Sequence, residues 1–292
     1  MYRKLLAFVL FITALTASAQ EDLFDLFEDS EKPTELVYAT FKGTRLINGQ
    51  TLETPGGGVA QYIISHRFGS FSDRYFYNFM GLDNAQIRMQ MDYGITDRLN
   101  IGAGRSSVLK VSDAFIKYRL LRQKTGANSF PFSLTLNSSV NYRGADYTDG
   151  FNHHNSDRLS YSNLAILGRK FNQKLSLQAA IGAVHWNLVP SPQDQNTIGV
   201  ISFGGRYKLT NRMALTSEYS ISTNTGVSNE TLHFNPISVG IDVETGGHVF
   251  QFHLGNVRSM SDPYWLTRNP YNPTAGQLYL GFNISRVFTI RD

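Results

Sequence analysis

The chain has 292 residues and contains no cysteine, which excludes disulfide frameworks and thiol chemistry. Its 27 basic and 23 acidic residues give a formal net charge of +4. The basic residues are not clustered, which argues against a nucleic-acid partner.

The first residues have the features of an export signal. Arg3 and Lys4 precede an apolar run that ends at Leu15, and small residues follow up to Ala19. This run is too short to span a bilayer as a helix, and no other part of the chain reaches that length. We predict that residues 1–19 are a cleaved secretory signal peptide. The mature protein is then either soluble in the periplasm or a β-barrel in the outer membrane.

Residues 20–35 form an acidic leader. They include seven acidic residues and a single basic one, Lys32. Acidic termini of this kind are usually disordered, and we favour that interpretation over a peptide that docks on a periplasmic partner. Residues 36–292 carry 24 basic and 16 acidic residues, so this part of the chain has a net charge of +8.

From residue 59 onward, apolar and polar residues alternate with a period of two. Residues 87–93, for example, read IRMQMDY. Such alternation is typical of a β-strand with one apolar and one polar face. Twelve such segments are predicted, at 59–68, 84–94, 98–106, 112–122, 130–142, 158–170, 174–188, 196–208, 212–222, 236–244, 248–256 and 274–288. The alternation is imperfect in the sixth, eighth and twelfth segments, so the facing of their side chains is left open.

The connections between these segments alternate in length. Short connections at 95–97, 171–173, 209–211 and 245–247 alternate with long ones at 70–83, 143–157, 223–235 and 257–273. Outer-membrane barrels have short periplasmic turns and long outer loops. We therefore predict an all-β fold over residues 36–292, a transmembrane antiparallel up-and-down β-barrel of about 12 strands. Residues 36–58 lead into it as an extra strand or a small plug.

The polar faces of the predicted strands define a candidate binding site in the lumen. The inward residues named by the alternation are Arg67, Arg88, Gln90, Asp92, Lys117, Arg119, Arg206, Glu218, Asp242 and Glu244. They could line a water-filled path, and their modest basic excess would favour anions. They could equally pair with one another and fill the barrel, because twelve strands lie between the filled and the open barrel sizes.

Three histidines are candidates for a metal or catalytic site. His153 and His154 lie with several aspartates in one predicted loop, but adjacent histidines are not a zinc spacing, so we predict a polar surface loop and no metal site. His66 could act as a catalytic base. Ser65 beside it points to the opposite strand face, and no nucleophile motif is present, so we predict an interfacial or structural residue and no catalytic site.

Two glycines and one loop are the remaining candidates for a binding site. Gly102 and Gly104 are not followed by a helix, so a phosphate loop is not expected; they should leave room inside the barrel. The loop 262–273, DPYWLTRNPYNP, is aromatic and stiffened by prolines. It could stack on a sugar ring or fold over the barrel mouth as a lid, and we favour the lid.

Several motifs resemble those of a Bacteroidota family of outer-membrane β-barrels filed as a domain of unknown function. They are FKGTRLINGQ at 41–50, ISHRFG at 64–69, GLDNA at 81–85 and YGITDR at 93–98. The resemblance covers nearly the whole mature chain. It implies an outer-membrane barrel and brings no catalytic residue, substrate or cofactor.

The sequence thus predicts a non-enzymatic barrel in the cell outer membrane that passes or binds a small polar solute. A structural or accessory subunit with a filled lumen is the alternative, and an outer-membrane lipid hydrolase is a distant one. The expected partners are outer-membrane lipid and a small polar or anionic solute, and no cofactor is expected.

Overall fold

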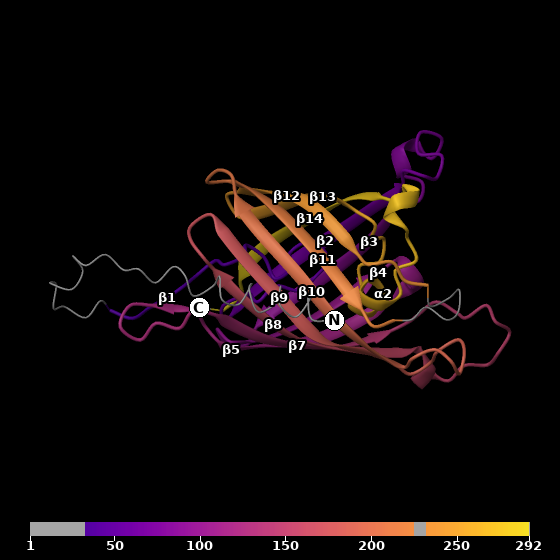
Figure 1. Cartoon of the computed structure of the whole chain (residues 1–292), viewed down its shortest axis with the longest axis horizontal. Coiled ribbons are helices and arrows are strands. Elements are labelled where there is room, and N and C mark those ends of the chain that lie inside the picture. Colours follow the sequence, from indigo (N-terminus) through magenta and orange to yellow (C-terminus); the bar gives the residue numbers. More distant parts are fainter. Residues whose placement is uncertain (1–32, 225–231, 292) are drawn as a thin grey trace, which may run out of the picture.

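Twelve antiparallel strands close into a barrel in the structure, a computed structural model that describes residues 33–224 and 232–291 (Figure 1). Its strands are β2 (Val59–Ser70), β3 (Gln86–Gly94), β4 (Leu99–Ser106), β5 (Ser112–Leu121), β7 (Ser133–Tyr142), β8 (Leu159–Lys170), β9 (Leu175–Trp186), β10 (Thr197–Lys208), β11 (Met213–Ser222), β12 (Ile237–Thr245), β13 (His248–Gly255) and β14 (Tyr279–Thr289). Each pairs with its neighbours in sequence, and β14 pairs with β2 to complete the wall. The predicted fold class is confirmed.

The ends of the strands differ from the prediction mainly at β14. The sequence placed its start at residue 274, whereas the strand begins at Tyr279. Pro273–Ala275 instead forms the 3-10 helix η6, which ends at Gly276 with a positive φ of 74°. Proline at the start of a helical turn and glycine just after it are the usual residues for such a turn, and they delay the strand.

Short turns gather at one end of the barrel and long loops at the other (Figure 1). Two short strands, β1 (Glu35–Leu36) and β6 (Lys124–Thr125), pair at the short-turn end, where the C-terminus also lies. The loops of the other end contain η2 (Phe79–Gly81), η3 (Val108–Lys110), η4 (Asn155–Arg158) and α2 (Asp262–Thr267). In the described part of the chain, no helix has the length and apolar character needed to cross a membrane. The predicted signal peptide and nearly all of the acidic leader lie outside the described residues.

Three of the short turns use the same hydrogen bond. A side-chain oxygen accepts from the backbone N–H three residues further on, in Thr96–Leu99 (3.0 Å), Asn172–Leu175 (2.8 Å) and Thr210–Met213 (3.0 Å). Short polar side chains of this kind hold the backbone of a turn by local bonds. The similarity of these turns in sequence therefore reflects one turn type used repeatedly.

The alternation along the strands sorts side chains between the two faces of the wall. On β3, Met89 and Met91 are about half exposed on the outside, whereas Arg88 and Asp92 are buried on the inside. Of the three strands with imperfect alternation, β8 and β10 have apolar residues on both faces: Leu164, Ile166, Ile198 and Val200 all point inward and are buried. Inward apolar residues require an apolar partner inside the lumen, and the chain itself supplies one.

Candidate functional site

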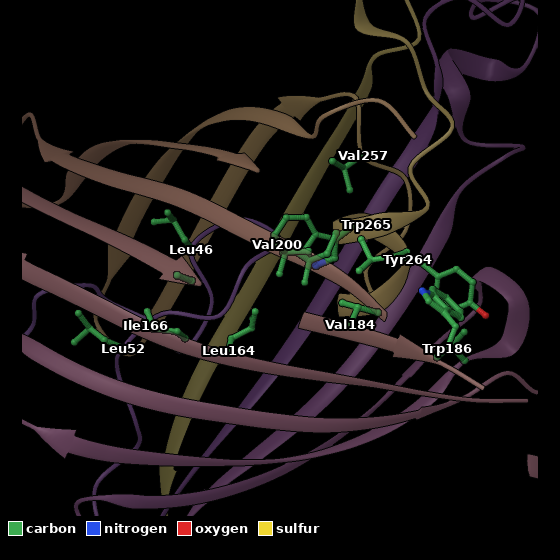
Figure 2. Packing of buried hydrophobic residues seen from close by; sticks show 14 of the residues in the cluster. Leu46, Leu52, Leu164, Ile166, Val184, Trp186, Val200, Val257, Tyr264 and Trp265 are labelled. Atoms are coloured by element: carbon green, nitrogen blue, oxygen red, sulfur yellow. The ribbon is translucent and has the colours of Figure 1, made fainter. Parts of the chain in front are cut away.

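Residues 40–53, here called the inner segment, lie inside the barrel. Most of them are buried, although they form no strand of the wall. A tight turn, closed by a hydrogen bond from the Leu46 N–H to the Gly49 carbonyl (2.9 Å), makes the tip. Figure 2 shows Leu46 and Leu52 of this segment within the barrel, near Leu164 and Ile166 of β8. The lumen is thus occupied by the part of the chain that leads into the first strand of the barrel.

Glu218 of β11 holds the tip of the inner segment. Its carboxylate accepts hydrogen bonds from the backbone N–H groups of Ile47 (3.3 Å), Asn48 (2.9 Å) and Gly49 (3.1 Å), and from the Asn48 side chain (2.5 Å). Arg67 on β2 donates to the Asn48 side-chain oxygen at 2.8 Å. Strands on different sides of the barrel therefore fix the same turn, and a buried carboxylate is compensated by four donors.

The inner segment meets the helix α2 in the lumen. Arg45 forms an ion pair with Asp262 of α2 (3.1 Å) and donates to Gln90 of β3 (2.7 Å). The Trp265 indole lies against Gly49 and donates to the same Asp262 carboxylate at 3.2 Å. All six residues of α2 are buried. The loop 262–273 therefore enters the barrel mouth with its helix, as the lid interpretation predicted.

Two basic residues of β5 hold the base of the inner segment. Lys117 donates to the backbone carbonyls of Thr44 (3.1 Å), Thr51 (3.2 Å) and Glu53 (3.2 Å). Arg119 forms an ion pair with the Glu53 carboxylate at 2.8 Å. Carbonyl oxygens are weaker partners for an ammonium group than a carboxylate, but three of them together satisfy its three N–H donors.

All ten residues predicted to face the lumen do point inward. Seven of them contact the inner segment: Arg67, Gln90, Asp92, Lys117, Arg119, Glu218 and Glu244. The other three bind elsewhere on the wall: Arg88 pairs with Asp113 (2.8 Å), Arg206 with Glu244 (2.6 Å), and Asp242 accepts from Gln251 (3.2 Å). In this conformation these side chains are engaged with protein groups.

The basic excess predicted for the lumen is offset by residues outside the ten that were predicted to face it. Asp113, Glu53 and Asp262 add three acids to the interior, whereas Lys42 and Arg45 add only two bases. Among the interior groups named here, basic and acidic side chains are then equal in number. These groups together carry no basic excess, and the anion preference of the lumen stays a prediction.

The residues that sequence reasoning missed fall into two classes. Asp113 shares the inward face of β5 with Lys117 and could have been found from the same alternation. Arg45 and Glu53 could not, because the inner segment has no periodicity that assigns its side chains to a face. Their positions follow only from the closed wall around them.

The glycines of β4 allow two inward side chains to lie close to the wall. A methyl group at Gly102 would collide with the Phe115 ring, and one at Gly104 would collide with the Arg88 guanidinium. The space that these glycines were expected to leave is therefore filled from neighbouring strands. It is not an open phosphate-binding loop.

The histidine candidates have ordinary surroundings. The His66 ring stacks on Phe282 (5.0 Å between centroids) and meets Phe68 edge-on (4.7 Å), and its Nδ1 has no hydrogen-bond partner. His153 bonds to Asp149 at 2.8 Å in an exposed loop. Within residues 33–224 and 232–291, no cluster of three or more histidine or carboxylate side chains has the arrangement of a metal site.

A half-buried histidine joins two of the long loops. His233 accepts a hydrogen bond from the Asn269 N–H at its Nδ1 (3.1 Å), just beyond α2. Asn269 also bonds to Phe234 through its carbonyl oxygen (2.7 Å) and its side-chain amide (3.1 Å). Burial lowers the pKa of His233 to about 4, because it penalises the charged imidazolium. The imidazole is therefore neutral at pH 7 and acts as an acceptor.

Comparison with known proteins gives one match over most of the chain. A family model described as "Membrane bound beta barrel domain (DUF5777)" matches residues 41–288. The match begins at Phe41, so all of the inner segment except Thr40 lies within the matched domain. No curated protein sequence matches the chain.

Solved structures with a similar architecture have very different sequences. They include the KdgM porin (TM-score 0.49, 9% identity, covering 79% of this chain and 99% of that one) and the NanC porin (0.48, 7%, 79% and 98%). An outer-membrane channel from Pseudomonas putida F1 is similar at a TM-score of 0.47, with 14% identity over 80% of this chain and 96% of that one. Identities this low do not transfer a solute or an activity.

Proposed function

Because the chain belongs to the family of membrane-bound β-barrel domains, we propose that it works as a non-enzymatic gated barrel in the outer membrane. Export would use residues 1–19 as a signal peptide cleaved after Ala19. The barrel would pass or bind a small polar solute. Passage would require the inner segment to leave its position in the lumen, since that segment occupies the centre of the barrel.

The polar character of the contacts around the tip of the inner segment carries this proposal. Glu218, Arg67 and Gln90 hold it by hydrogen bonds from three separate strands. Each of these hydrogen bonds involves a charged group and contributes about 1.5–3 kcal/mol net, but water can take the place of the lost partner when the segment moves. A barrel that only needed filling could have used apolar residues on all sides.

The wall that would remain after displacement is balanced in charge. Five basic groups (Arg67, Arg88, Lys117, Arg119, Arg206) face five acidic ones (Asp92, Asp113, Glu218, Asp242, Glu244). Charges of both signs with no excess attract polar molecules without strong preference for anions or cations. We therefore propose a polar solute of low net charge.

A reversible cross-link tests the gate. A side chain at Gly168 would touch the Leu52 methyl group, so Leu52→Cys with Gly168→Cys would tie the inner segment to β8. The chain has no other cysteine, so the pair is unique. We expect the oxidised protein to show no current above an empty planar bilayer, and the reduced protein to conduct. The Leu52→Cys variant alone, with the same oxidant and reductant, is the matched control.

The outcomes separate the candidates. Equal conductance of the oxidised and reduced proteins would show that solutes pass without moving the inner segment. Well-folded protein that stays silent after reduction would overturn the gated barrel. It would favour instead a structural or accessory subunit with a permanently filled lumen.

That second function has an observation of its own. The inner segment contacts the wall on nearly every side, including Thr135 of β7, Gln178 of β9 and Gln251 of β13 through its backbone carbonyls. Asn283 of β14 also donates to the Ile47 carbonyl at 2.9 Å. Contacts spread around the whole circumference would suit a permanent filling.

A further inference from the structure

The loop between β2 and β3 carries an exposed aromatic lobe, residues 71–82. Phe76 is 87% exposed, Tyr77 73% and Phe79 62%. Phe71, Met80 and Leu82 are exposed beside them. Figure 1 shows this lobe at the long-loop end of the barrel, standing out sideways from the wall while α2 lies within the mouth. Exposed apolar side chains gathered in one place mark an interaction surface.

Several backbone groups of the lobe are hydrogen-bonded within the lobe itself. The N–H groups of Asn78, Gly81 and Leu82 donate to the carbonyls of Arg74 (3.0 Å), Asn78 (2.9 Å) and Phe79 (3.1 Å). The Asn78 side chain donates to the Asp73 carbonyl at 2.8 Å. Backbone groups that enter a lipid environment must find their partners within the protein. These bonds fulfil part of that condition, and the lobe turns its aromatic side chains outward.

The lobe is fixed to the barrel by two touching glycines. Gly81, with a φ of +79°, lies against the backbone of Gly69 in β2, and any side chain on Gly81 would collide there. Arg74, Phe79 and Met80 also have positive φ angles of 41°, 44° and 55°. Strained positions of this kind cost free energy and tend to cluster at functional sites. The lobe is thus a built feature of the loop.

An aromatic surface on the outside of the wall continues toward the lobe. His66 and Phe68 of β2 pack with Phe282 of β14 on the outward face. Within the lobe, Phe71 packs on Tyr75 (4.6 Å between centroids) and Arg74 lies over the Tyr77 ring (4.0 Å). Aromatic side chains gather at both membrane interfaces of transmembrane barrels.

We propose that the aromatic lobe inserts into the outer leaflet of the membrane beside the barrel and anchors that side of it. Lipid is the occupant that these observations fit. The lobe projects sideways toward the bilayer, continues an outward aromatic surface, and carries one acidic and one basic residue, Asp73 and Arg74, so it has no net charge to attract a charged partner. Burial of its phenyl rings among acyl chains would remove the exposed apolar area from water.

Single-cysteine labelling tests the insertion in the intact protein. Phe76→Cys is labelled with an environment-sensitive fluorophore and the barrel is reconstituted in phosphatidylcholine vesicles that carry a nitroxide on the upper acyl chain. Met89→Cys, on the outward face of β3, is the control for a probe in the membrane. Phe151→Cys, 76% exposed in another long loop, is the control for a probe in water.

We expect the probe at residue 76 to emit at shorter wavelength and lose most of its intensity to the nitroxide, as at residue 89. The probe at residue 151 should keep its intensity. The inference rests on the membrane placement proposed above, and the controls separate the two.

Absence of quenching at both residue 76 and residue 89 would contradict that placement and the inference with it. Quenching at 89 without quenching at 76 would overturn the inference alone. A blue shift at 76 that appears only at high protein-to-lipid ratio would overturn it in favour of contact with a second copy of the chain.

Discussion

The inner segment lies between two unlike walls of the same lumen. On one side, β2, β3, β5 and β11 hold it with hydrogen bonds and ion pairs. On the other, β8, β9 and β10 present apolar residues that pack with Leu46, Leu52 and α2 (Figure 2). Water can replace the first kind of contact, but an apolar contact that is opened to water is simply lost. We therefore expect the apolar wall to contribute more to the stability of the fold. The polar wall should hold the inner segment through contacts that can open and close again.

Truncation on the apolar wall should have the largest effect on stability. Leu52 is only 1% exposed and packs against Gly168 of β8, so Leu52→Ala leaves a cavity. Such a change costs about 2–5 kcal/mol in a well-packed core. We expect the compact band on an unboiled denaturing gel to convert to the unfolded form at a clearly lower temperature.

Leu209→Ala is the matched control for this change. Leu209 lies in a short turn and is about half exposed. Its truncation should shift the conversion temperature much less. If Leu52→Ala shifted it no more than Leu209→Ala, the apolar wall would not be the stabilising one.

A change on the polar wall should have a smaller effect on stability and a larger one on conductance. Glu218→Gln keeps one acceptor oxygen but removes the charge that four donors of the inner segment tip share. Hydrogen bonds to a charged group contribute about 1.5–3 kcal/mol, and part of this is retained by the amide. We expect the variant to fold and to conduct more than the wild type in planar bilayers.

Lys42→Gln provides the comparison at the edge of the lumen. Lys42 pairs with Glu244 at 2.8 Å, where water reaches both side chains, and Glu244 keeps its ion pair with Arg206 (2.6 Å) in this variant. Exposed ion pairs contribute little, so this variant should resemble the wild type in conductance. If both variants conducted equally, the hold on the tip would not control the path.

The two walls also differ in what the sequence could predict. On β3 and β5 the period of two persists, so Arg88, Asp92 and Lys117 were placed inward correctly. On β8 and β10 the alternation fails because the inward side chains are apolar too, where they pack on Leu46, Leu52 and α2. These packing partners lie far away in the chain. A period of two is visible only where one face of a strand is apolar and the other is polar. Where the lumen is filled by apolar groups, both faces of the strand are apolar and the period is lost. The inner segment itself has no period, and nothing in its sequence places it among the strands that it contacts.

The smallest expected effect is a change in the pH dependence of stability, and it comes from the loops above the lumen. His233 is neutral in the folded protein because burial lowers its pKa to about 4, and its Nδ1 accepts from Asn269. An unfolded histidine titrates near 6.5. The stability that the neutral ring contributes is therefore fully present above about pH 6.5 and is lost as the pH falls through about 4.

We expect His233→Gln, whose amide oxygen can accept the same bond, to lose less stability than the wild type between pH 7 and pH 4, as measured by the unfolding midpoint in urea. Because carboxylates titrate in the same range in both proteins, the difference between the two midpoints isolates this histidine. Identical pH dependence would mean that the contact between the two loops opens without consequence for the barrel beneath.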